Sequence, residues 1–461
     1  MRHWLKLLCV GCAVIVSAGC PPVPPADGPP REGAPKATPV PTPPAAPADA
    51  PADVPADVPA DAPPGDKRLF APLIEQVKQW GGRMEFDDEG RLITVDLLAA
   101  SLSDADVEKL AKLPHLQSLR LKGAEITDAS MASLAGMAGL TTLDLDTVGV
   151  TDAGVKTLTS LENLKWLRLH RLSRMTDAAA EYFKEFPRLE HLLLTDSYIS
   201  DGGLHFISQL ENLKTLDLDG SDMIGDSGIE LVAGMNNLRT LRVRSRGISD
   251  GGLEYLAGMK QLRSLSVKDS LAVSDYGLEF VGRMTGLEEL SLAQAFQVTD
   301  DGLAHLAGLT KLRRLDLRRL AINGSGLVHL KGMKELEFLD LGGTSISDQA
   351  LSHLKALPSL KSLNVMATPL TDAAMQALGE LKGLRALIMR DVKISDAGLS
   401  RLTTIKNLGR LELRGVPVTD ASIKHLARFT QLKELDVSNT GISEAGLDEL
   451  KRALPNTKIA H

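Results

Sequence analysis

A Ser or Thr followed by an acidic residue recurs at intervals of 24 or 25 residues along most of this chain. The pair stands at Ser103-Asp104, Thr127-Asp128, Thr151-Asp152, Thr176-Asp177, Ser200-Asp201, Ser249-Asp250, Ser274-Asp275, Thr299-Asp300, Ser347-Asp348, Thr371-Asp372, Ser395-Asp396, Thr419-Asp420 and Ser443-Glu444. Two registers are degenerate, with Gly225-Asp226 and Asn323-Gly324 in this place. A fixed period of this length is typical of stacked-repeat proteins. It therefore predicts one continuous solenoid.

Each period contains the pattern of one strand and one short helix. Leu143 and Leu145 alternate with polar residues, as one buried face of a strand requires. Thr151-Asp152 then predicts a helix start, because the hydroxyl can cap free N–H groups and the carboxylate complements the helix dipole. The helix over residues 151–160 directs Val155 and Leu158 inward. One period cannot bury its own leucines, so neighbouring periods must stack.

The repeated motif has two recognisable halves. Leu189-x-x-Leu192-x-Leu194 represents the strand half, and Ser395-Asp396-Ala397-Gly398-Leu399-x-x-Leu402 represents the helical half. The region from Leu92 to about Ile459 resembles the leucine-rich repeat family, in the helical-backed subtype of ribonuclease-inhibitor-like and F-box-associated repeats. The resemblance implies an α/β solenoid (a horseshoe) with a parallel β-sheet on the concave face and short α-helices on the convex face.

The chain departs from the family at one position. Where the family usually has Asn or Cys after the strand, this chain has residues such as Ala124, Ser197 and Thr344. We therefore expect no complete asparagine ladder.

The N-terminus reads as a targeting segment. Basic residues precede a short apolar run from Leu7 to Ala18, which is too short to span a membrane. The ending Ser17-Ala18-Gly19-Cys20 resembles the lipobox of bacterial lipoproteins. The resemblance implies that residues 1–19 are a lipoprotein-type signal peptide and that Cys20 carries the lipid. The alternative is an ordinary secretory signal with an incidental cysteine.

Composition divides the rest of the chain. Residues 20–66 are rich in Pro, Ala and Asp and predict a disordered linker that holds the repeats away from a membrane, or merely an unstructured tail. Residues 67–102 read as an N-terminal cap with the first strand, built from a helix and a pair of strands. Residues 103–453 hold the repeats, and residues 454–461 read as a C-terminal cap strand.

Charge and cysteine usage limit the possible partners. The net charge is −7, which argues against nucleic acid as a partner. The three cysteines all lie within the first twenty residues, so the repeats hold no disulfide. We expect a monomer with a membrane contact through the lipid anchor.

The strand positions that face away from the core form three columns across the concave sheet, and these columns predict a binding surface. The middle position of each L-x-L forms a column of Asp96, Arg120, Asp144, Arg168, Leu193, Asp217, Arg242, Ser266, Ser291, Asp316, Asp340, Asn364, Ile388, Glu412 and Asp436. Asp is the default in this column, so departures from it are the informative positions.

One departure is basic. Arg242, Arg244 and Lys268 lie on one side of a floor of small residues, and Arg314 and Arg318 lie on the other. The floor consists of Ser264, Ser266, Ser291 and Ala293. Such a cluster could receive an acidic protein partner or a polyanionic glycan. Alternatively, the bases pair with Asp217, Asp219, Glu289 and Asp316.

Two further departures are apolar. Phe338, Met366, Ala386 and Ile388 form the larger patch. Trp166 and Leu193 form a smaller patch, with His170 and His191 beside it. Aromatic and Met side chains are frequent interface anchors. The alternative is isolated surface hydrophobes, which are common.

The sequence gives little sign of catalysis or metal binding. His305, His329 and His353 recur in register on successive helices, but helices about 10 Å apart are too distant to share a zinc ion. No cofactor is expected. We therefore expect a non-enzymatic, lipid-anchored protein of the bacterial cell envelope that binds a protein through its concave sheet. The alternative is an envelope scaffold without a specific ligand, and an unrecognised enzyme is the weakest reading.

Overall fold

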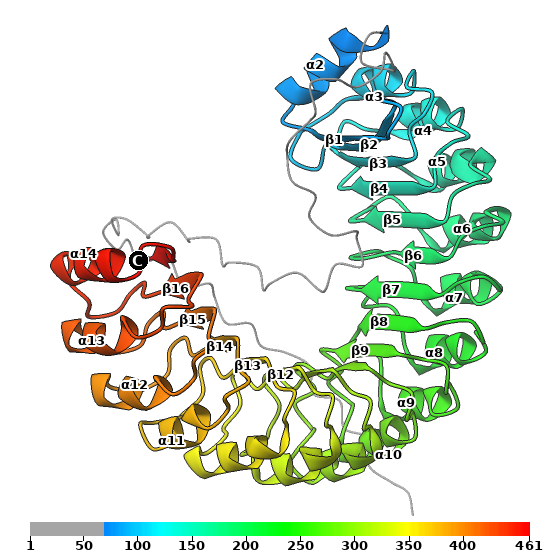
Figure 1. Cartoon of the computed structure of the whole chain (residues 1–461). Coiled ribbons are helices and arrows are strands. Elements are labelled where there is room, and N and C mark those ends of the chain that lie inside the picture. The colour runs from blue at the N-terminus through cyan, green and yellow to red at the C-terminus, as the bar shows by residue number, and fades with distance from the viewer. Residues whose placement is uncertain (1–68) are drawn as a thin grey trace, which may run out of the picture. The chain divides into compact units, whose positions relative to one another are not determined.

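A computed structural model describes residues 69–461. Within this range seventeen strands form one open sheet. The first two strands pair antiparallel, and every later strand pairs in parallel with the strand before it in the chain. Figure 1 shows that the strands line the inner face of this solenoid and that the helical segments line its outer face. The predicted α/β solenoid is confirmed.

The strands are short, with three to five residues each. They are β1 (Arg83–Phe86), β2 (Leu92–Asp96), β3 (Ser118–Lys122), β4 (Thr142–Asp146), β5 (Trp166–His170), β6 (His191–Leu193), β7 (Thr215–Asp219), β8 (Thr240–Arg244), β9 (Ser264–Lys268), β10 (Glu289–Ser291), β11 (Arg314–Asp316), β12 (Phe338–Asp340), β13 (Ser362–Asn364), β14 (Ala386–Ile388), β15 (Arg410–Glu412), β16 (Glu434–Asp436) and β17 (Lys458–Ala460).

Helical segments alternate with the strands. The α-helices are α2 (Ala71–Gln79), α3 (Asp104–Leu110), α4 (Asp128–Leu134), α5 (Asp152–Thr157), α6 (Asp177–Ala180), α7 (Asp201–Ile207), α8 (Asp226–Ala233), α9 (Asp250–Leu256), α10 (Asp275–Gly282), α11 (Ala374–Gly379), α12 (Asp396–Leu402), α13 (Ile423–Leu426) and α14 (Glu444–Ala453). The 3₁₀ segments are η1 (Leu158–Ser160), η2 (Glu181–Glu185), η3 (Gly302–Gly308), η4 (Ser325–Gly332), η5 (Asp348–Ala356) and η6 (Asp420–Ser422).

Three consecutive repeats differ from the prediction of short α-helices, because η3, η4 and η5 are 3₁₀ helices throughout. Their inward leucines lie three residues apart, as in Leu303 and Leu306 or Leu327 and Leu330. Residues three apart eclipse in a 3₁₀ helix and are also neighbours on an α-helix. The spacing in the sequence therefore fits both forms.

The core is continuous along the solenoid. In a typical repeat Leu143, Leu145, Val150, Val155 and Leu158 are all fully buried. Burial of one such side chain stabilises the fold by roughly 1.5–3 kcal/mol. The inward positions predicted from the repeat are confirmed.

Most of the Ser/Thr hydroxyls cap the helices as predicted, whereas Ser347 and Ser395 make no cap hydrogen bond. The acidic residue has a further role. The Thr151 hydroxyl accepts a hydrogen bond from the backbone N–H of Ala153. Thr151 also donates its own N–H and Oγ1–H to the Asp128 carboxylate of the preceding repeat, over 2.8 and 2.6 Å. The Asp therefore bonds the next repeat in addition to lying in the first turn of its own helix.

This contact recurs along the solenoid, and we call it the Ser/Thr–Asp ladder. Its carboxylates accept from the backbone or hydroxyl of the next repeat at Asp104, Asp128, Asp152, Asp177, Asp201, Asp226, Asp250, Asp275, Asp300, Asp348, Asp372, Asp396 and Asp420.

The ladder also explains the glycine of the helical half-motif. A Cβ on Gly277 would lie 2.3 Å from Oδ1 of Asp250, and one on Gly398 would lie 2.2 Å from Oδ1 of Asp372. The carboxylate of the preceding repeat occupies the space that a side chain would need. These glycines are therefore required by close approach between repeats.

The two ends of the described chain add short elements to the sheet. Helix α2 precedes the antiparallel pair β1–β2, and β17 adds a last strand to β16. In the range 69–461 no helix combines the length and apolar character that crossing a membrane needs. The predicted signal peptide, Cys20 and the linker of residues 20–66 lie outside the described residues.

Candidate functional site

The outward column predicted for the concave sheet is present in the predicted register. The strand pairings align Asp96 with Arg120 and Asp144, and they continue in this line through Ser266 to Asp436. The candidate side chains therefore share one face, with neighbouring strands about 4.8 Å apart.

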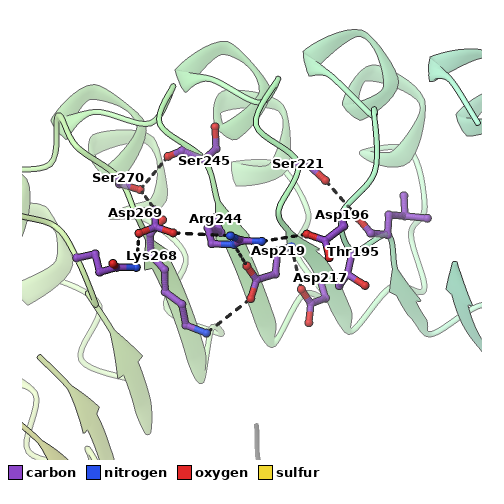
Figure 2. A network of polar contacts seen from close by, with 12 residues as sticks. Thr195, Asp196, Asp217, Asp219, Ser221, Arg244, Ser245, Lys268, Asp269 and Ser270 are labelled. Carbon is purple, nitrogen blue, oxygen red and sulfur yellow. Dashed lines mark hydrogen bonds and ion pairs between the residues drawn. The ribbon is translucent and has the colours of Figure 1, made fainter. Parts of the chain in front are cut away.

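Arg244 is the centre of a polar network on this face (Figure 2). Its Nε lies 2.7 Å from Oδ1 of Asp219, and its Nη2 lies 2.9 Å from Oδ1 of Asp196. Its Nη1 is 3.9 Å from Oδ2 of Asp269. Partial burial alone would lower the pKa of Arg244, but the hydrogen bond that it donates to Asp219 and the three carboxylate charges raise it. The guanidinium is thus held in one place by acids from three neighbouring repeats.

The other basic residues of the predicted cluster are also paired. Lys268 Nζ lies 3.6 Å from Asp219 Oδ2, and Arg242 Nη1 lies 3.6 Å from Asp217 Oδ2. Of the two alternatives that the sequence allows, pairing with neighbouring acids is the one observed on this side.

The same holds across the floor of small residues. Arg314 Nε is 4.0 Å from Glu289 Oε1, and Arg318 Nη2 is 2.7 Å from Asp316 Oδ2. In the floor, Ser291 donates a hydrogen bond to Asp316 over 2.9 Å. An acidic partner would therefore have to compete with carboxylates that the fold already supplies.

Asp316 and Asp340 lie side by side on β11 and β12 and titrate differently. Burial, reinforced by the charge of Asp316, raises the pKa of Asp340 to about 6. Burial would also raise the pKa of Asp316, but the hydrogen bonds and charge of Arg318 lower it. Asp340 also accepts hydrogen bonds from Gly342 N–H and the Asn364 amide. The anionic form of Asp316 is thus stabilised, whereas the anionic form of Asp340 is destabilised.

Asp144 is the most deeply buried acid of the column. It lies between Arg120 Nε, 3.2 Å away, and Arg168 Nη1, 3.6 Å away. Burial raises its pKa although both arginines act in the opposite direction. Oδ1 of Asp144 and Nε of Arg168 have no hydrogen-bond partner among the described residues.

The larger apolar patch lies on the same face, with its members incompletely covered. Phe338 is half-buried, and the Arg314 guanidinium lies over its ring at 4.3 Å. Met366, Ala386 and Ile388 are half-buried. The pairing of β12, β13 and β14 brings Phe338 and Ala386 into one row, two strands apart.

The smaller patch combines apolar and histidine side chains. Trp166 pairs with His191, and Leu193 lies opposite Arg168 on the neighbouring strand. His170 Nδ1 is 2.6 Å from the Thr195 hydroxyl, and burial lowers the pKa of His170. This imidazole is therefore mostly neutral near pH 7.

The histidines of the outer face stay apart from this site. His305 and His329 are exposed on η3 and η4, and His353 is half-buried on η5. Among residues 69–461, His, Cys, Asp and Glu side chains form no group of three that could hold a metal ion.

The sequence reasoning missed a second surface, on the loops that follow the strands. A hollow of about 300 Å³ opens there between the loops after β5, β6 and β7. It is lined by Arg171, Ser173, Asp196, Ser197, Tyr198, Gly220, Asp222 and Met223. Tyr198 and Met223 stand at loop positions where other repeats have Gly149, Ser345 or Pro369. This difference between repeats is the feature of the sequence that could have revealed the second surface.

Serines stabilise these loops in place of an asparagine ladder. Ser197 and Ser221 join their hydroxyls over 3.0 Å, and Ser221 also donates to the Leu194 carbonyl. Ser245 donates to the Ile224 carbonyl of the preceding loop. All three serines are buried, so the loops of β6 to β8 are bonded to one another.

Comparison with known proteins agrees with this architecture. A family model described as Leucine Rich repeat matches residues 112–135 and 209–233. No curated protein sequence matches the chain. Each matched segment is about one repeat long, and the observed solenoid has the architecture of leucine-rich repeats.

Solved structures with a similar fold come from distant proteins. An internalin of Listeria monocytogenes is 21% identical and covers 80% of this chain and 95% of its own, with a TM-score of 0.47. A leucine-rich repeat protein of Leptospira interrogans is 18% identical over 78% of this chain and 95% of its own, with a TM-score of 0.43. The TLR13–ssRNA13 complex is 17% identical over 80% of this chain and 60% of that chain, with a TM-score of 0.52. At this identity the last likeness supports the fold alone.

Proposed function

We propose that this leucine-rich repeat protein binds a protein partner through its concave sheet and does not catalyse a reaction. Leucine-rich repeat proteins typically mediate protein–protein interaction. The observation that supports the proposal is the set of apolar side chains on a face that the fold itself leaves uncovered. It consists of Trp166, Leu193, Phe338 and Ile388 on the strands and Met366 just after β13, all half-buried. Such residues are typical anchors of a binding surface.

The paired bases suit a role in specificity. Arg244 and Arg318 are held by carboxylates at 2.7 Å, so their guanidinium groups are already oriented before a partner arrives. Fixed charges of both signs select a complementary partner more than they add raw affinity. The net charge of −7 and the paired bases favour a protein over a nucleic acid.

The proposal includes a place in the cell. The N-terminal sequence supports export across the inner membrane and attachment through a lipid on Cys20. The repeats would then act in the bacterial cell envelope, in the periplasm or at the cell surface.

A second candidate is an envelope scaffold without a specific ligand. The pairing of Arg242, Arg244, Lys268, Arg314 and Arg318 with neighbouring acids supports it, because a face that satisfies its own charges needs no partner.

A pull-down from envelope extract separates these candidates. The first bait is the chain from residue 67 onward, and the second carries Arg242→Glu, Arg314→Glu and Ile388→Asp. A control bait carries Glu230→Arg and Glu254→Arg, two exposed positions on the outer helices α8 and α9. Circular dichroism first establishes that all baits fold.

A partner lost only from the concave variant is the expected result. A partner retained by the concave variant would place the binding site elsewhere. A bait that captures nothing would favour the scaffold.

A further inference from the structure

The most exposed large apolar side chains of the described residues lie away from the concave sheet. Four of them lie on the loops that follow β6, β7, β9 and β10, two or three residues before the Ser/Thr position of the repeat. Their exposed fractions are 58% for Tyr198, 60% for Met223, 39% for Leu271 and 51% for Phe296. We call these four residues the loop-edge row. A row of this kind is a larger apolar surface than single surface hydrophobes provide.

The loops that carry the row are fixed against one another. Backbone bridges join Gly225 to Gly247 and Ser249 to Ala272, and a third joins Ser274 to Gln297. The Gln297 amide donates to the Leu271 carbonyl of the preceding loop. With strands about 4.8 Å apart, the loops from β5 to β10 extend over roughly 20–25 Å. The row is therefore an ordered surface on which a partner would lose little free energy to loop ordering.

Unpaired charges accompany the row. Arg174 precedes Tyr198 by one repeat, and Arg246 lies in the repeat between Met223 and Leu271. Both are exposed, and neither makes an ion pair or side-chain hydrogen bond with any residue in the range 69–461. In the loops that follow β5 to β10, the Asp222 carboxylate is the one acid without an ion pair or side-chain hydrogen bond.

The other charged groups nearby are already engaged. Arg171 lies 3.6 Å from Asp196, and Lys268 lies 3.6 Å from Asp219. Arg319 donates to Gln294. In the loops that follow β5 to β10, the unpaired charges are therefore two cations and one anion.

We propose that the loop-edge row binds an extended segment of the protein partner that carries both apolar and acidic residues. The segment runs across the loops from β5 to β10, a distance that about seven extended residues span. Its apolar side chains enter the hollow between Tyr198 and Met223 and cover Leu271 and Phe296. Its carboxylates pair with Arg174 and Arg246. This inference rests on the proposed function and names the chemistry of the partner.

A random library of phage-displayed twelve-residue peptides, panned on the purified full-length protein, tests the inference. The expected result is enrichment of peptides that combine Asp or Glu with apolar residues. An enriched peptide is then synthesised, and its Kd is measured by fluorescence anisotropy for the unaltered protein and four variants.

Two variants alter the row. Tyr198→Ser with Phe296→Ser, and Arg174→Glu with Arg246→Glu, are each expected to weaken binding about tenfold or more. Asp222→Lys is expected to leave the Kd unchanged or to lower it. Ile388→Asp, on the concave sheet, is expected to leave the Kd within about twofold. All these positions are at least partly exposed, so unchanged circular dichroism spectra are expected.

Three results would overturn the inference: enrichment of basic peptides that Asp222→Lys repels, no enrichment at all, or a Kd that the row variants leave unchanged. If only Ile388→Asp abolished peptide binding, the binding site would lie on the concave sheet and not at the loop edge. Loss of the envelope partner from the row variant alone would refute the concave site and support the loop edge.

Discussion

At the scale of single residues, Asp316 and Asp340 illustrate how one position of the repeat acquires different properties. Both stand in the outward column, on adjacent strands. Arg318 donates two hydrogen bonds to Asp316 and lies 3.4 Å from Asp340. The Arg318 guanidinium thus stabilises the charge of Asp316 more than that of Asp340, and the two pKa values differ as a result.

The separation predicts opposite effects of two matched variants. Because the folded-state pKa of Asp340 is raised to about 6, its contribution to stability is highest below about pH 4 and falls as pH rises through 6. Asp340→Asn is therefore expected to be more favourable for stability at pH 7.5 than at pH 4.5. The change that the substitution makes in the free energy of unfolding should be more positive by roughly 1–3 kcal/mol at the higher pH.

Asp316→Asn is the control, since the pKa of Asp316 is lowered and its stabilisation is present at neutral pH. That variant should destabilise the protein more at pH 7.5 than at low pH. Urea unfolding at both pH values measures the two effects. Equal changes for the two variants would show that Arg318 does not distinguish the acids.

A second residue-scale prediction concerns the repeat glycine. Gly277→Ala is expected to destabilise the protein by roughly 1–3 kcal/mol, because the new Cβ would lie 2.3 Å from the Asp250 carboxylate. Helix propensity alone would favour Ala at this position in α10, so the sign of the effect is diagnostic.

Gly258 provides the matched control, since a Cβ there would meet no atom within 4 Å. Gly258→Ala should change the melting temperature little, or raise it slightly. Similar losses for both variants would argue that backbone freedom, and not contact with the carboxylate, selects glycine.

At the scale of elements, the Ser/Thr–Asp ladder has one gap. Gly324 stands where other repeats have Asp, so Ser347 N–H bonds to the backbone carbonyl of Asn323 instead of to a carboxylate. The joint between η4 and η5 therefore lacks the side-chain link that its neighbours have. Solenoid stability depends on such interfaces between adjacent repeats.

Because of this gap, we expect the effect of removing a ladder carboxylate to depend on whether the carboxylate lies next to the gap. Asp348→Ala removes the two hydrogen bonds that Thr371 donates, and Asp250→Ala removes the two that Ser274 donates. Each loss should cost roughly 2–4 kcal/mol. Asp348→Ala leaves two consecutive joints without a carboxylate, so we expect urea unfolding in two steps.

Hydrogen exchange should then report early opening in the segment 342–371 of the Asp348→Ala protein. Asp250→Ala, between intact joints, should unfold in one step. A single transition for both variants would show that the backbone bond at Asn323 replaces the missing link fully.

At the scale of the whole molecule, we predict that the solenoid is attached to a membrane through a lipid. The sequence predicts a lipid on Cys20 and a long linker before the repeats. In this arrangement the concave face and the loop-edge row would be presented to partners at a distance from the membrane. A lipid anchor stabilises membrane attachment in proportion to its buried chain length.

Cys20→Ala provides the test. The altered protein, expressed in a bacterium, is expected to move from the membrane fraction to the soluble fraction and to incorporate no labelled palmitate. A variant with Cys9→Ala and Cys12→Ala, which leaves Cys20 in place, should remain in the membrane fraction. Labelling that persists without Cys20 would exclude this lipid site and favour an ordinary secretory signal.

The sequence alone determined the architecture because each repeat imposes the same local constraints. Leu143, Thr151 and Val155 and their equivalents specify a strand, a helix start and a buried face in every period. A fixed period also aligns equivalent positions on neighbouring strands, so the column from Asp96 to Asp436 could be predicted in its correct register.

The tertiary structure decided which charged and polar side chains have a partner and which side chains stay exposed. The contact of Arg244 with Asp196 joins residues 48 apart in the chain and depends on side-chain rotamers that periodicity does not specify. The second role of the ladder carboxylates and the exposure of Tyr198 likewise depend on how closely adjacent repeats approach. Local pattern therefore determined the fold, whereas packing between repeats determined where this protein has surface left for a partner.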